Sequence, residues 1–580
     1  MLKTSNTVAD RVAEYLVESA GIDRVFIYPG GTIAPLVNAF VRLGIKIEVF
    51  KHEQGAAYAA LAFARLTGKA QVVMVTSGPG VTNVLTPLAD AYYDSTPTLF
   101  IMGQVGTGDL CSGRNVRQRG FQETPTVELT RPISKLACCP VTADEALAIV
   151  PSLLAGMLDG RQGPAVLDFP MDIQRAECIK PIPATSLYER KSRSSLSVAD
   201  HQALDEIVVA VMSAKRPILL LGHGALGIKD SKLIQDLATR TDALVVSSLL
   251  GLGSYSTWDE RFLGYVGHTG HLAANKAVHS SDLVFALGTR LDVRQTGTMT
   301  KSFVPEGRVV WVNNDPSEIN NPRVVVDWAL QADLGEVIDV LLKKIPQNQV
   351  DRDMLWQKAC RNERLFNQED QSAPGNPEVI SPKQALKSLA SYMKDKTPGV
   401  VTTGVGSHQQ WAARHLPFAP NGWRLLTSAG HGAMGYDLPS AIGASMARPG
   451  EMVVCVVGDG SLLMNIQELA SLAERSLPVK IILLNNRRLG IVSQFQLITW
   501  GDDPGSGHFQ TPDFVAITKG FGIYAERVNS LAHLESNMNE FLLRQGPGLI
   551  EIPIDHNANV VPMLLGGQEM NDMWMGKLDA

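Results

Sequence analysis

Two polar residues late in the chain follow consecutive apolar segments, where they could bind a metal ion. Asp459 comes after residues 453–457 in Gly458-Asp459-Gly460-Ser461, and Asn486 follows residues 479–484. Parallel strands of an open α/β sheet present such residues at one edge, and their oxygen atoms suit Mg²⁺. A helix starting near Ser461 would offer amide donors to a diphosphate. The pattern predicts a Mg²⁺–diphosphate site, whereas a turn Asp and a capping Asn are the structural alternative.

A carboxylate stands where an alanine-rich, apolar helix is expected to begin. Glu53 lies in Phe50-Lys-His-Glu-Gln-Gly-Ala-Ala-Tyr. A glutamate in the first turn can simply complement the helix dipole. Its apolar neighbours favour a second interpretation, in which Glu53 acts as an acid or hydrogen-bond donor in catalysis.

Two glycine-rich loops match G-x-G-x-x-G, at residues 222–227 and 430–435. Each match is also typical of a tight strand-to-helix turn. After the first copy, the next expected strand ends in Ser247-Ser248. A dinucleotide fold has an acidic residue there to hold a ribose. A nicotinamide-dependent dehydrogenase is therefore disfavoured.

Short β-branched runs alternate with helical periods along the chain, which predicts parallel, doubly wound α/β sheets. Polar stretches at 189–197 and 346–376 are interpreted as connectors. We predict three α/β domains, at residues 1–185, 195–345 and 375–560. The expected strands are residues 24–28, 46–50, 71–76, 98–102, 165–169, 218–221, 243–246, 283–287, 309–312, 400–403, 424–427, 452–457, 480–484 and 548–552.

Composition excludes several classes of protein. The 580 residues are 45% hydrophobic and 19% charged, as in globular proteins, and the length suggests about three or four domains. The net charge of −6, without a long basic run, argues against a nucleic-acid partner. The six cysteines show no C-x-x-C or zinc-like spacing, which favours a reduced, cytoplasmic location. No apolar run reaches the roughly 18 residues of a membrane span, so neither secretion nor membrane insertion is expected.

These motifs together resemble the thiamine diphosphate (ThDP) enzymes of the acetolactate synthase type, the acetohydroxyacid synthase catalytic subunits. The resemblance rests on Glu53 in its segment, on Ser77-Gly-Pro-Gly80-Val-Thr-Asn83, and on Gly458-Asp-Gly-Ser461 with Asn486. Further matching segments are residues 28–31, 120–123, 161–164, 287–297, 405–411 and 561–570. It implies a pyrimidine-binding domain, a central FAD-type domain, a diphosphate-binding domain, and a tail at 561–580 over the active site.

The resemblance also implies cofactors and partners: ThDP, Mg²⁺ and FAD, with a flavin that has no redox role in the main reaction. It implies a homodimer or homotetramer whose active sites are shared between protomers, and it leaves open a small regulatory subunit. The substrates would be small 2-oxo acids.

Roles follow for the matching residues. Glu53 would hydrogen-bond the pyrimidine N1′ and promote loss of the proton at C2 of the thiazolium. Gly31, Phe121 and Gln122 would line the reaction pocket; each could otherwise be scaffold, Phe121 most plausibly. Mg²⁺ would be bound by Asp459, Asn486 and the backbone carbonyl of Arg488. The other ThDP residues would be Pro79, Asn83, Ser407, His408, Met434 (otherwise a core methionine), Gly458, Gly460, Ser461, Leu489 and Gly490. The FAD residues would be Arg161, Gly222, Gly224, Thr269, Thr289, Arg290, Asp292, Arg294 and Asp333.

Several positions depart from the family pattern. Asn313 stands where the family usually has an acid, Ser407 where it has Gln, and Asp437 where it has Gly. On the substrate side, Met171 replaces a Lys and Phe495 replaces a Trp.

Arg294, Phe495 and Met171 are the predicted substrate residues. Arg294 would grip the carboxylate of the second substrate, and an ion pair with Asp292 is its structural alternative. Without the Trp, we expect little preference for 2-oxobutyrate over pyruvate.

We therefore predict a ThDP- and Mg²⁺-dependent carboligase of the acetolactate synthase type, which condenses two 2-oxo acids with loss of CO₂. A related ThDP enzyme that decarboxylates, ligates or cleaves a different 2-oxo acid or dione is the main alternative. A nicotinamide oxidoreductase and a catalytically inactive FAD-binding scaffold are the alternatives from other classes.

Overall fold

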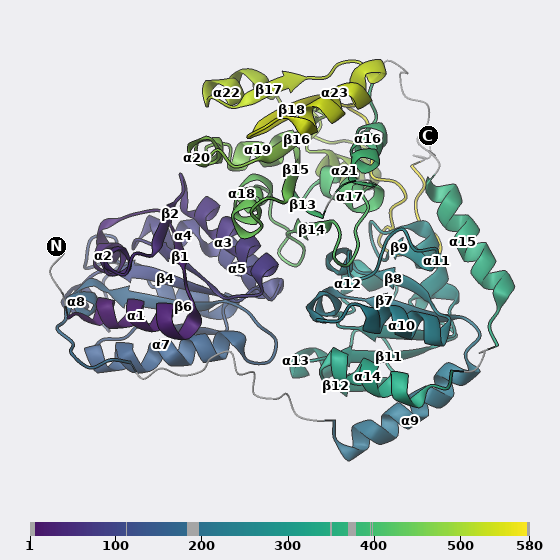
Figure 1. The fold of residues 1–580 in the computed structure, drawn as a ribbon, viewed down its shortest axis with the longest axis horizontal. Coiled ribbons are helices and arrows are strands. Elements are labelled where there is room, and N and C mark those ends of the chain that lie inside the picture. The colour runs from purple at the N-terminus through teal and green to yellow at the C-terminus, as the bar shows by residue number, and fades with distance from the viewer. Residues whose placement is uncertain are drawn as a thin grey trace.

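Three six-stranded parallel sheets, each flanked by helices, form three lobes of the protein (Figure 1). The computed structural model describes residues 6–111, 113–182, 196–347, 351–368, 379–394, 396 and 398–576. The three sheets confirm the predicted fold class. The domain boundaries themselves stay predictions, and most of the predicted connector at 189–197 lies outside the described residues.

The first sheet has the strand order β2-β1-β3-β4-β6-β5. Its central strands are apolar and fully buried, as expected for a parallel sheet covered on both faces. The strands are β1 Arg24–Ile27, β2 Lys46–Val49, β3 Gln71–Val75, β4 Thr98–Gln104, β5 Leu136–Cys138 and β6 Ala165–Pro170. The helices are α1 Val8–Ala20, α2 Ala34–Arg42, α3 Glu53–Thr67, α4 Pro79–Asn83, α5 Leu85–Tyr93, α6 Thr126–Thr130, α7 Ala143–Leu158 and α8 Met171–Arg175.

The central sheet has the order β12-β11-β10-β7-β8-β9, with the switch point of the strand order between β7 and β10. This is the dinucleotide-binding order, and ligands bind at such a switch point. The strands are β7 Pro217–Leu221, β8 Leu244–Ser247, β9 Phe262–Tyr265, β10 Leu283–Leu287, β11 Arg308–Asn313 and β12 Trp328–Gln331. The helices are α9 Val198–Ser213, α10 Lys232–Thr241, α11 Leu272–Ser280, α12 Val293–Thr296, α13 Pro316–Ile319, α14 Leu334–Lys344 and α15 Met354–Gln368.

The third sheet, β14-β13-β15-β16-β18-β17, repeats the strand order of the first. The two outer domains are therefore alike in topology, although no repeat is visible in the sequence. The strands are β13 Gly399–Thr403, β14 Arg424–Thr427, β15 Met452–Gly458, β16 Val479–Asn485, β17 Tyr524–Arg527 and β18 Gly548–Pro553. The helices are α16 Pro382–Lys394, α17 Ser407–His415, α18 Asp437–Ala447, α19 Asp459–Met464, α20 Glu468–Arg475, α21 Gly490–Trp500, α22 Phe514–Gly520 and α23 Leu531–Leu543.

Two interpretations of the sequence need correction. The stretch 346–376 is more than a connector, because α15 forms within it and packs against α11. Four strands, β5, β9, β12 and β17, were not predicted, and each is the last strand at one edge of its sheet. β5, β12 and β17 are only partly buried and lack the apolar run that marked the inner strands.

The outer domains meet through α3 and α18, which lie side by side (Figure 1). A Cβ at Gly443 of α18 would come within 2.7 Å of Ala59 Cα in α3, so only glycine allows this approach. Beside the crossing, Tyr58 packs edge-on against Tyr436 with 5.2 Å between ring centroids. The alanine-rich sequence of α3 thus serves close helix packing.

The C-terminal segment packs on the central domain. Met563 and Trp574 form an antiparallel bridge, and the backbone N–H of Leu564 donates to the carbonyl of His268 at 2.7 Å. Met570 and Met573 are buried in the core of that domain. Among the described helices, none combines the length and apolar character needed to cross a membrane.

Candidate active site

The predicted metal ligands lie at adjacent strand ends. β15 and β16 are paired so that Gly458 is in register with Leu484, which places Asp459 and Asn486 at the same sheet edge. Asp459 is 2% exposed, and its Oδ2 has no hydrogen-bond partner. Burial raises the pKa of Asp459 to about 6. A buried carboxylate oxygen without a partner is what a metal ligand looks like before its ion binds.

The chemistry of the surrounding donors fits Mg²⁺. The described residues contain no group of three His, Cys, Asp or Glu side chains suited to a metal. Any ion here would depend on amide, carbonyl and diphosphate oxygens in addition to Asp459, a set that Mg²⁺ accepts. His556 Nδ1 lies 2.8 Å from the backbone oxygen of Asn486, and Arg488 Nε donates to Ser493 Oγ at 2.6 Å. These contacts hold the loop that follows β16.

The other predicted diphosphate residues converge on this edge. A Cβ at Gly490 would lie 2.8 Å from Ser407 Oγ and 3.0 Å from Asn486 Nδ2, and one at Gly458 would lie 2.8 Å from His408 Nδ1. Ser407 Oγ is buried without a hydrogen-bond partner. The two glycines thus allow these polar side chains to pack closely against the backbone at this edge.

Met434 lies on the other side of the same turn. A Cβ at Gly460 would be 3.4 Å from Met434 Cε and 2.6 Å from Leu489 Cδ2. Met434 follows the positive-φ Gly432 in the second glycine-rich loop, and Gly435 also has positive φ. This copy of the motif is therefore a turn that presents Met434.

Glu53 begins α3 and is 6% exposed. Asn83 Nδ2 donates to Glu53 Oε2 at 2.9 Å. Gln122, in the left-handed region at φ 65°, packs against the loop before Pro79: a Cβ at Gly78 would lie 2.8 Å from Gln122 Cβ. The structure thus brings these predicted residues of the first domain together.

Gly31 and Phe121 are less closely packed by neighbouring atoms than the residues around Glu53. Gly31 begins a short 3₁₀ helix and has no atom within 4 Å of where a Cβ would stand. Phe121 is 85% exposed. The ring of Phe121 therefore does not pack in the core of this chain, and its role stays a prediction.

The start of α3 contacts the third domain within one chain. Asn465 Nδ2 donates both to Gln54 Oε1 at 2.9 Å and to the carbonyl of Gly435 at 2.7 Å. The N–H of Lys51 donates to Glu468 Oε1 at 3.1 Å. The start of α3 therefore rests on the α19–α20 segment, next to the turn that carries Met434.

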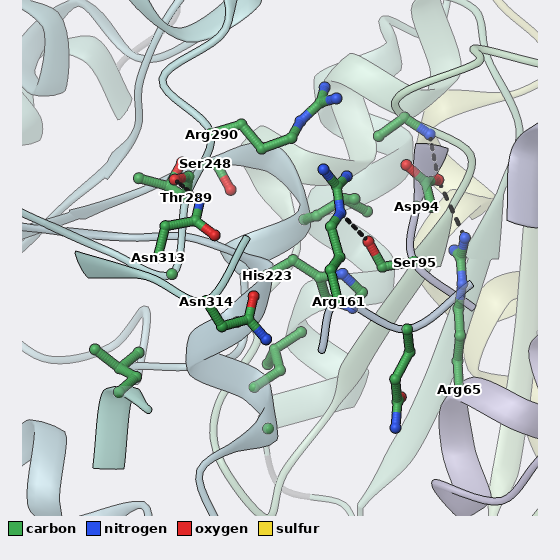
Figure 2. Close-up of a pocket in the computed structure, with 18 of the residues that line it drawn as sticks. Arg65, Asp94, Ser95, Arg161, His223, Ser248, Thr289, Arg290, Asn313 and Asn314 are labelled. Carbon is green, nitrogen blue, oxygen red and sulfur yellow. Dashed lines mark hydrogen bonds and ion pairs between the residues drawn. The ribbon is translucent and has the colours of Figure 1, made fainter. Parts of the chain in front are cut away.

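A cavity of about 1190 Å³ opens at the switch point of the central sheet (Figure 2). Every residue predicted for FAD lines it except Gly222: Arg161, Gly224, Thr269, Thr289, Arg290, Asp292, Arg294 and Asp333. Gly222 supports the wall, since a Cβ there would be 2.5 Å from Thr289 Cα. The loop continues as a 3₁₀ helix at His223–Gly227, not as the α-helix of a dinucleotide fingerprint.

Arg161 spans from the first domain to the central one at this cavity. Its Nε donates to Ser95 Oγ at 2.8 Å, as Figure 2 shows, and Nη1 pairs with Asp315 at 3.2 Å and Glu318 at 2.8 Å. The side chain of Asn313 is also engaged: Nδ2 donates to the carbonyl of Thr289 at 3.0 Å. At the position where the family usually has an acid, Asn313 thus has a neutral amide that is hydrogen-bonded within the protein.

The cavity also contains a histidine that sequence analysis did not single out. Burial and the nearby Arg65 guanidinium lower the pKa of His223 to about 4, so its ring is neutral at physiological pH. Its position between Gly222 and Gly224, inside the first glycine-rich loop, was the feature of the sequence that could have indicated a place in this cavity.

Arg294 is free of the ion pair that was its structural alternative. Arg290 takes that partner, with Nη2 at 2.6 Å from Asp292 Oδ2. Asp292 Oδ1 caps α12 by accepting the backbone N–H of Arg294 at 3.0 Å. The ion-pair hypothesis is therefore wrong for Arg294, which lines the large cavity and a smaller one of about 240 Å³ beside Leu564.

The remaining substrate residues lie elsewhere. Phe495, on α21, is 52% exposed and packs edge-on against Trp500 at 5.6 Å between centroids. Met171 begins α8 in the first domain. In the described parts of the chain, no recorded hydrogen bond, ion pair or ring contact joins either residue to Arg294.

Comparison with known proteins agrees with this geometry. Three family models match: the N-terminal TPP binding domain of thiamine pyrophosphate enzymes over residues 6–129, their central domain over 204–341, and their C-terminal TPP binding domain over 404–552.

Curated relatives match along nearly the whole chain. Acetolactate synthase isozyme 2 large subunit of Escherichia coli (strain K12) is 34% identical over 96% of this chain and 98% of its own. The acetolactate synthase large subunit of Haemophilus influenzae is 34% identical over 97% and 98%, and the chloroplastic acetolactate synthase of Arabidopsis thaliana is 36% identical over 97% and 84%. The chain thus belongs to the thiamine pyrophosphate enzymes, in the acetolactate synthase family.

Proposed function

We propose that this protein is a ThDP- and Mg²⁺-dependent acetolactate synthase, which joins two molecules of pyruvate into 2-acetolactate with loss of CO₂. The observation that carries the proposal is the placement of the Glu53–Asn83 pair against the segment that begins with the partnerless carboxylate of Asp459. The chain thus contains both an acid suited to the pyrimidine end of ThDP and a metal ligand suited to its diphosphate end.

The chain's own residues divide the work between the cofactor's two ends. Asp459 and Asn486, with the carbonyl of Arg488, would hold Mg²⁺ against the diphosphate. Glu53, oriented by Asn83, would hold a proton at the pyrimidine N1′. When bound, ThDP supplies an acidic thiazolium carbon and an electron sink for the decarboxylation.

Other residues would position the reactants. Met434 would support the cofactor from beneath, Gly31 and Gln122 would line the pocket, and Arg294 would bind the carboxylate of the acceptor. Because Arg294 has no competing salt bridge to Asp292, its guanidinium is available for a bidentate contact.

The central cavity is proposed to bind FAD in a structural role. Its volume, its position at the switch point and the close approach of Gly222 to Thr289 support this assignment. FAD has to fit beside an Arg161 that already donates to Ser95, Asp315, Glu318 and the carbonyl of Tyr93, and beside an uncharged Asn313. Both features predict weaker binding of FAD than a free arginine and a carboxylate would give.

The assembly is proposed to be a cytoplasmic homodimer or homotetramer with active sites shared between protomers. Two relatives are named large subunits, which supports a small regulatory partner here. Mixing Glu53→Gln chains with Asp459→Ala chains tests the sharing. Shared sites would restore part of the activity, whereas a site completed within one chain, as the Gln54–Asn465 contact allows, would restore none.

Mass spectrometry of the products from ¹³C-pyruvate tests the function. We expect labelled 2-acetolactate and labelled CO₂, formed only when ThDP and Mg²⁺ are both present. Asp459→Ala should abolish Mg²⁺-dependent ThDP binding in calorimetry, while Asp513→Ala, at an exposed helix cap, should bind normally. Acetaldehyde as the main product, or turnover of a dione only, would favour a related ThDP enzyme.

A further inference from the structure

Asp437 is a buried carboxylate that ties together three elements of the diphosphate region. It begins α18 and is 1% exposed. Its Oδ1 accepts from His408 Nε2 at 2.9 Å and from the backbone N–H of Gly404, which follows β13. Its Oδ2 accepts from Ser461 Oγ in α19. One side chain at the start of α18 thus ties the β13–α17 segment to the start of α19.

The burial of this charge is compensated locally. Among the ion pairs of the described residues, Asp437 takes part only in the one with His408. Three donors and the positive end of α18 offset the loss of hydration. Because the buried carboxylate needs all three donors, it restricts the positions of Gly404, His408 and Ser461.

The constraint determines which edge of the His408 ring faces the site. A carboxylate can only accept, so Nε2 donates to Asp437 and Nδ1 is left on the opposite side. Nδ1 lies 2.7 Å from where a Cβ would stand at Gly406 and 2.8 Å from one at Gly458. That edge of the ring therefore packs against the backbone of Gly458, which begins the turn at residues 458–461.

Ser461 extends the same network toward the middle of the cofactor site. Its Oγ accepts from the backbone N–H of Gly435 at 2.9 Å while it donates to Asp437. Gly435 is the neighbour of Met434. The carboxylate therefore couples the diphosphate end to the turn that carries Met434.

We infer that Asp437 is a positioning residue for the diphosphate end of the cofactor, which holds the His408 ring against the Gly458 turn where the diphosphate would bind. This inference rests on the proposed function. Asp437 stands where the family pattern has glycine, so the device is a property of this chain and not of the family's shared machinery.

Calorimetry with two probes tests the inference: inorganic pyrophosphate with Mg²⁺, and thiamine, which lacks the diphosphate. Asp437→Asn keeps the shape but removes the charge, and should weaken pyrophosphate binding about tenfold, the effect of losing one charge-assisted hydrogen bond. Thiamine binding should not change. In a His408→Asn background, the same change should have less than about a twofold effect, because Asp437 acts through His408.

A matched control is Asp168→Asn, which alters a buried, hydrogen-bonded carboxylate of the first domain and should leave pyrophosphate binding unchanged. Asp437→Gly, the family residue, provides a second variant if the asparagine protein does not fold, and should show the same loss of pyrophosphate binding. Wild-type affinity in the Asp437 variants, or an equal effect with and without His408, would overturn the inference alone. Failure of the wild type to bind Mg²⁺–ThDP would overturn the proposed function with it.

Discussion

Replacing Gly443 with alanine should separate the two helices that join the outer domains. The new Cβ would stand 2.7 Å from Ala59 Cα, whereas carbon atoms pack at about 3.5 Å or more. α3 and α18 would have to move apart by about 1 Å, because the obstacle is backbone and cannot rotate away. Overpacking of this kind costs about 3 kcal/mol, and the better helix propensity of alanine returns about 1 kcal/mol. The net loss in unfolding free energy is about 2 kcal/mol.

The same displacement should affect catalysis, because α3 begins with Glu53. A shift of about 1 Å in a catalytic group can reduce the rate about 100-fold. We therefore expect Gly443→Ala to lower kcat strongly while the Mg²⁺–ThDP affinity, set by the third domain, changes less. Urea denaturation measures the loss of stability, and steady-state kinetics with ThDP titration measures the split between rate and binding.

Gly520→Ala is the matched control. Gly520 ends α22, and no atom lies within 4 Å of the position its Cβ would take. This variant should be as stable and active as the wild type, or slightly more stable. A Gly443→Ala protein with wild-type stability and kcat would refute the argument that the helix crossing positions Glu53.

Three further predictions concern the active site and its surroundings. Glu53→Gln should slow exchange of the C2 proton of bound ThDP by about 100-fold or more, as measured by H/D exchange in NMR, and a wild-type rate would contradict its role as the acid. Burial raises the pKa of Asp168 to about 7, so between the unfolded value of 3.8 and pH 7 the folded protein holds a proton that the unfolded chain has lost. The free energy of unfolding should therefore fall as pH rises through this window, by at most about 1.4 kcal/mol per pH unit. Urea denaturation at pH 5 and pH 8 should show a smaller pH dependence for Asp168→Asn than for the wild type. An equal pH dependence in the two proteins would show that Asp168 does not titrate in this window. Phe495→Trp should raise the preference for 2-oxobutyrate by about 1 to 3 kcal/mol in a competition assay, and a wild type that already strongly prefers 2-oxobutyrate would show that this pocket works differently.

The inner strands and the order of the motifs could be predicted from the sequence alone. Apolar runs such as residues 481–484 are local signals, because a strand buried on both faces is largely apolar along its length. Asp459 and Asn486 could be placed at one sheet edge for a similar reason: parallel strands end together, so a residue's place after its strand fixes its edge.

Contacts between distant segments were decided by the tertiary structure. Edge strands such as β17 and the helix α15 have one exposed face, and their sequences do not show what covers the other. The sequence permitted Asp292 to pair with either Arg290 or Arg294, and only the backbone cap at α12 resolved the choice. Asp437 was visible only as a departure from a pattern, because its partners lie in the β13–α17 segment and in α19, which meet α18 only when the sheet folds. Strand runs and motif order are properties of continuous segments, whereas side-chain partners depend on which segments the fold brings together.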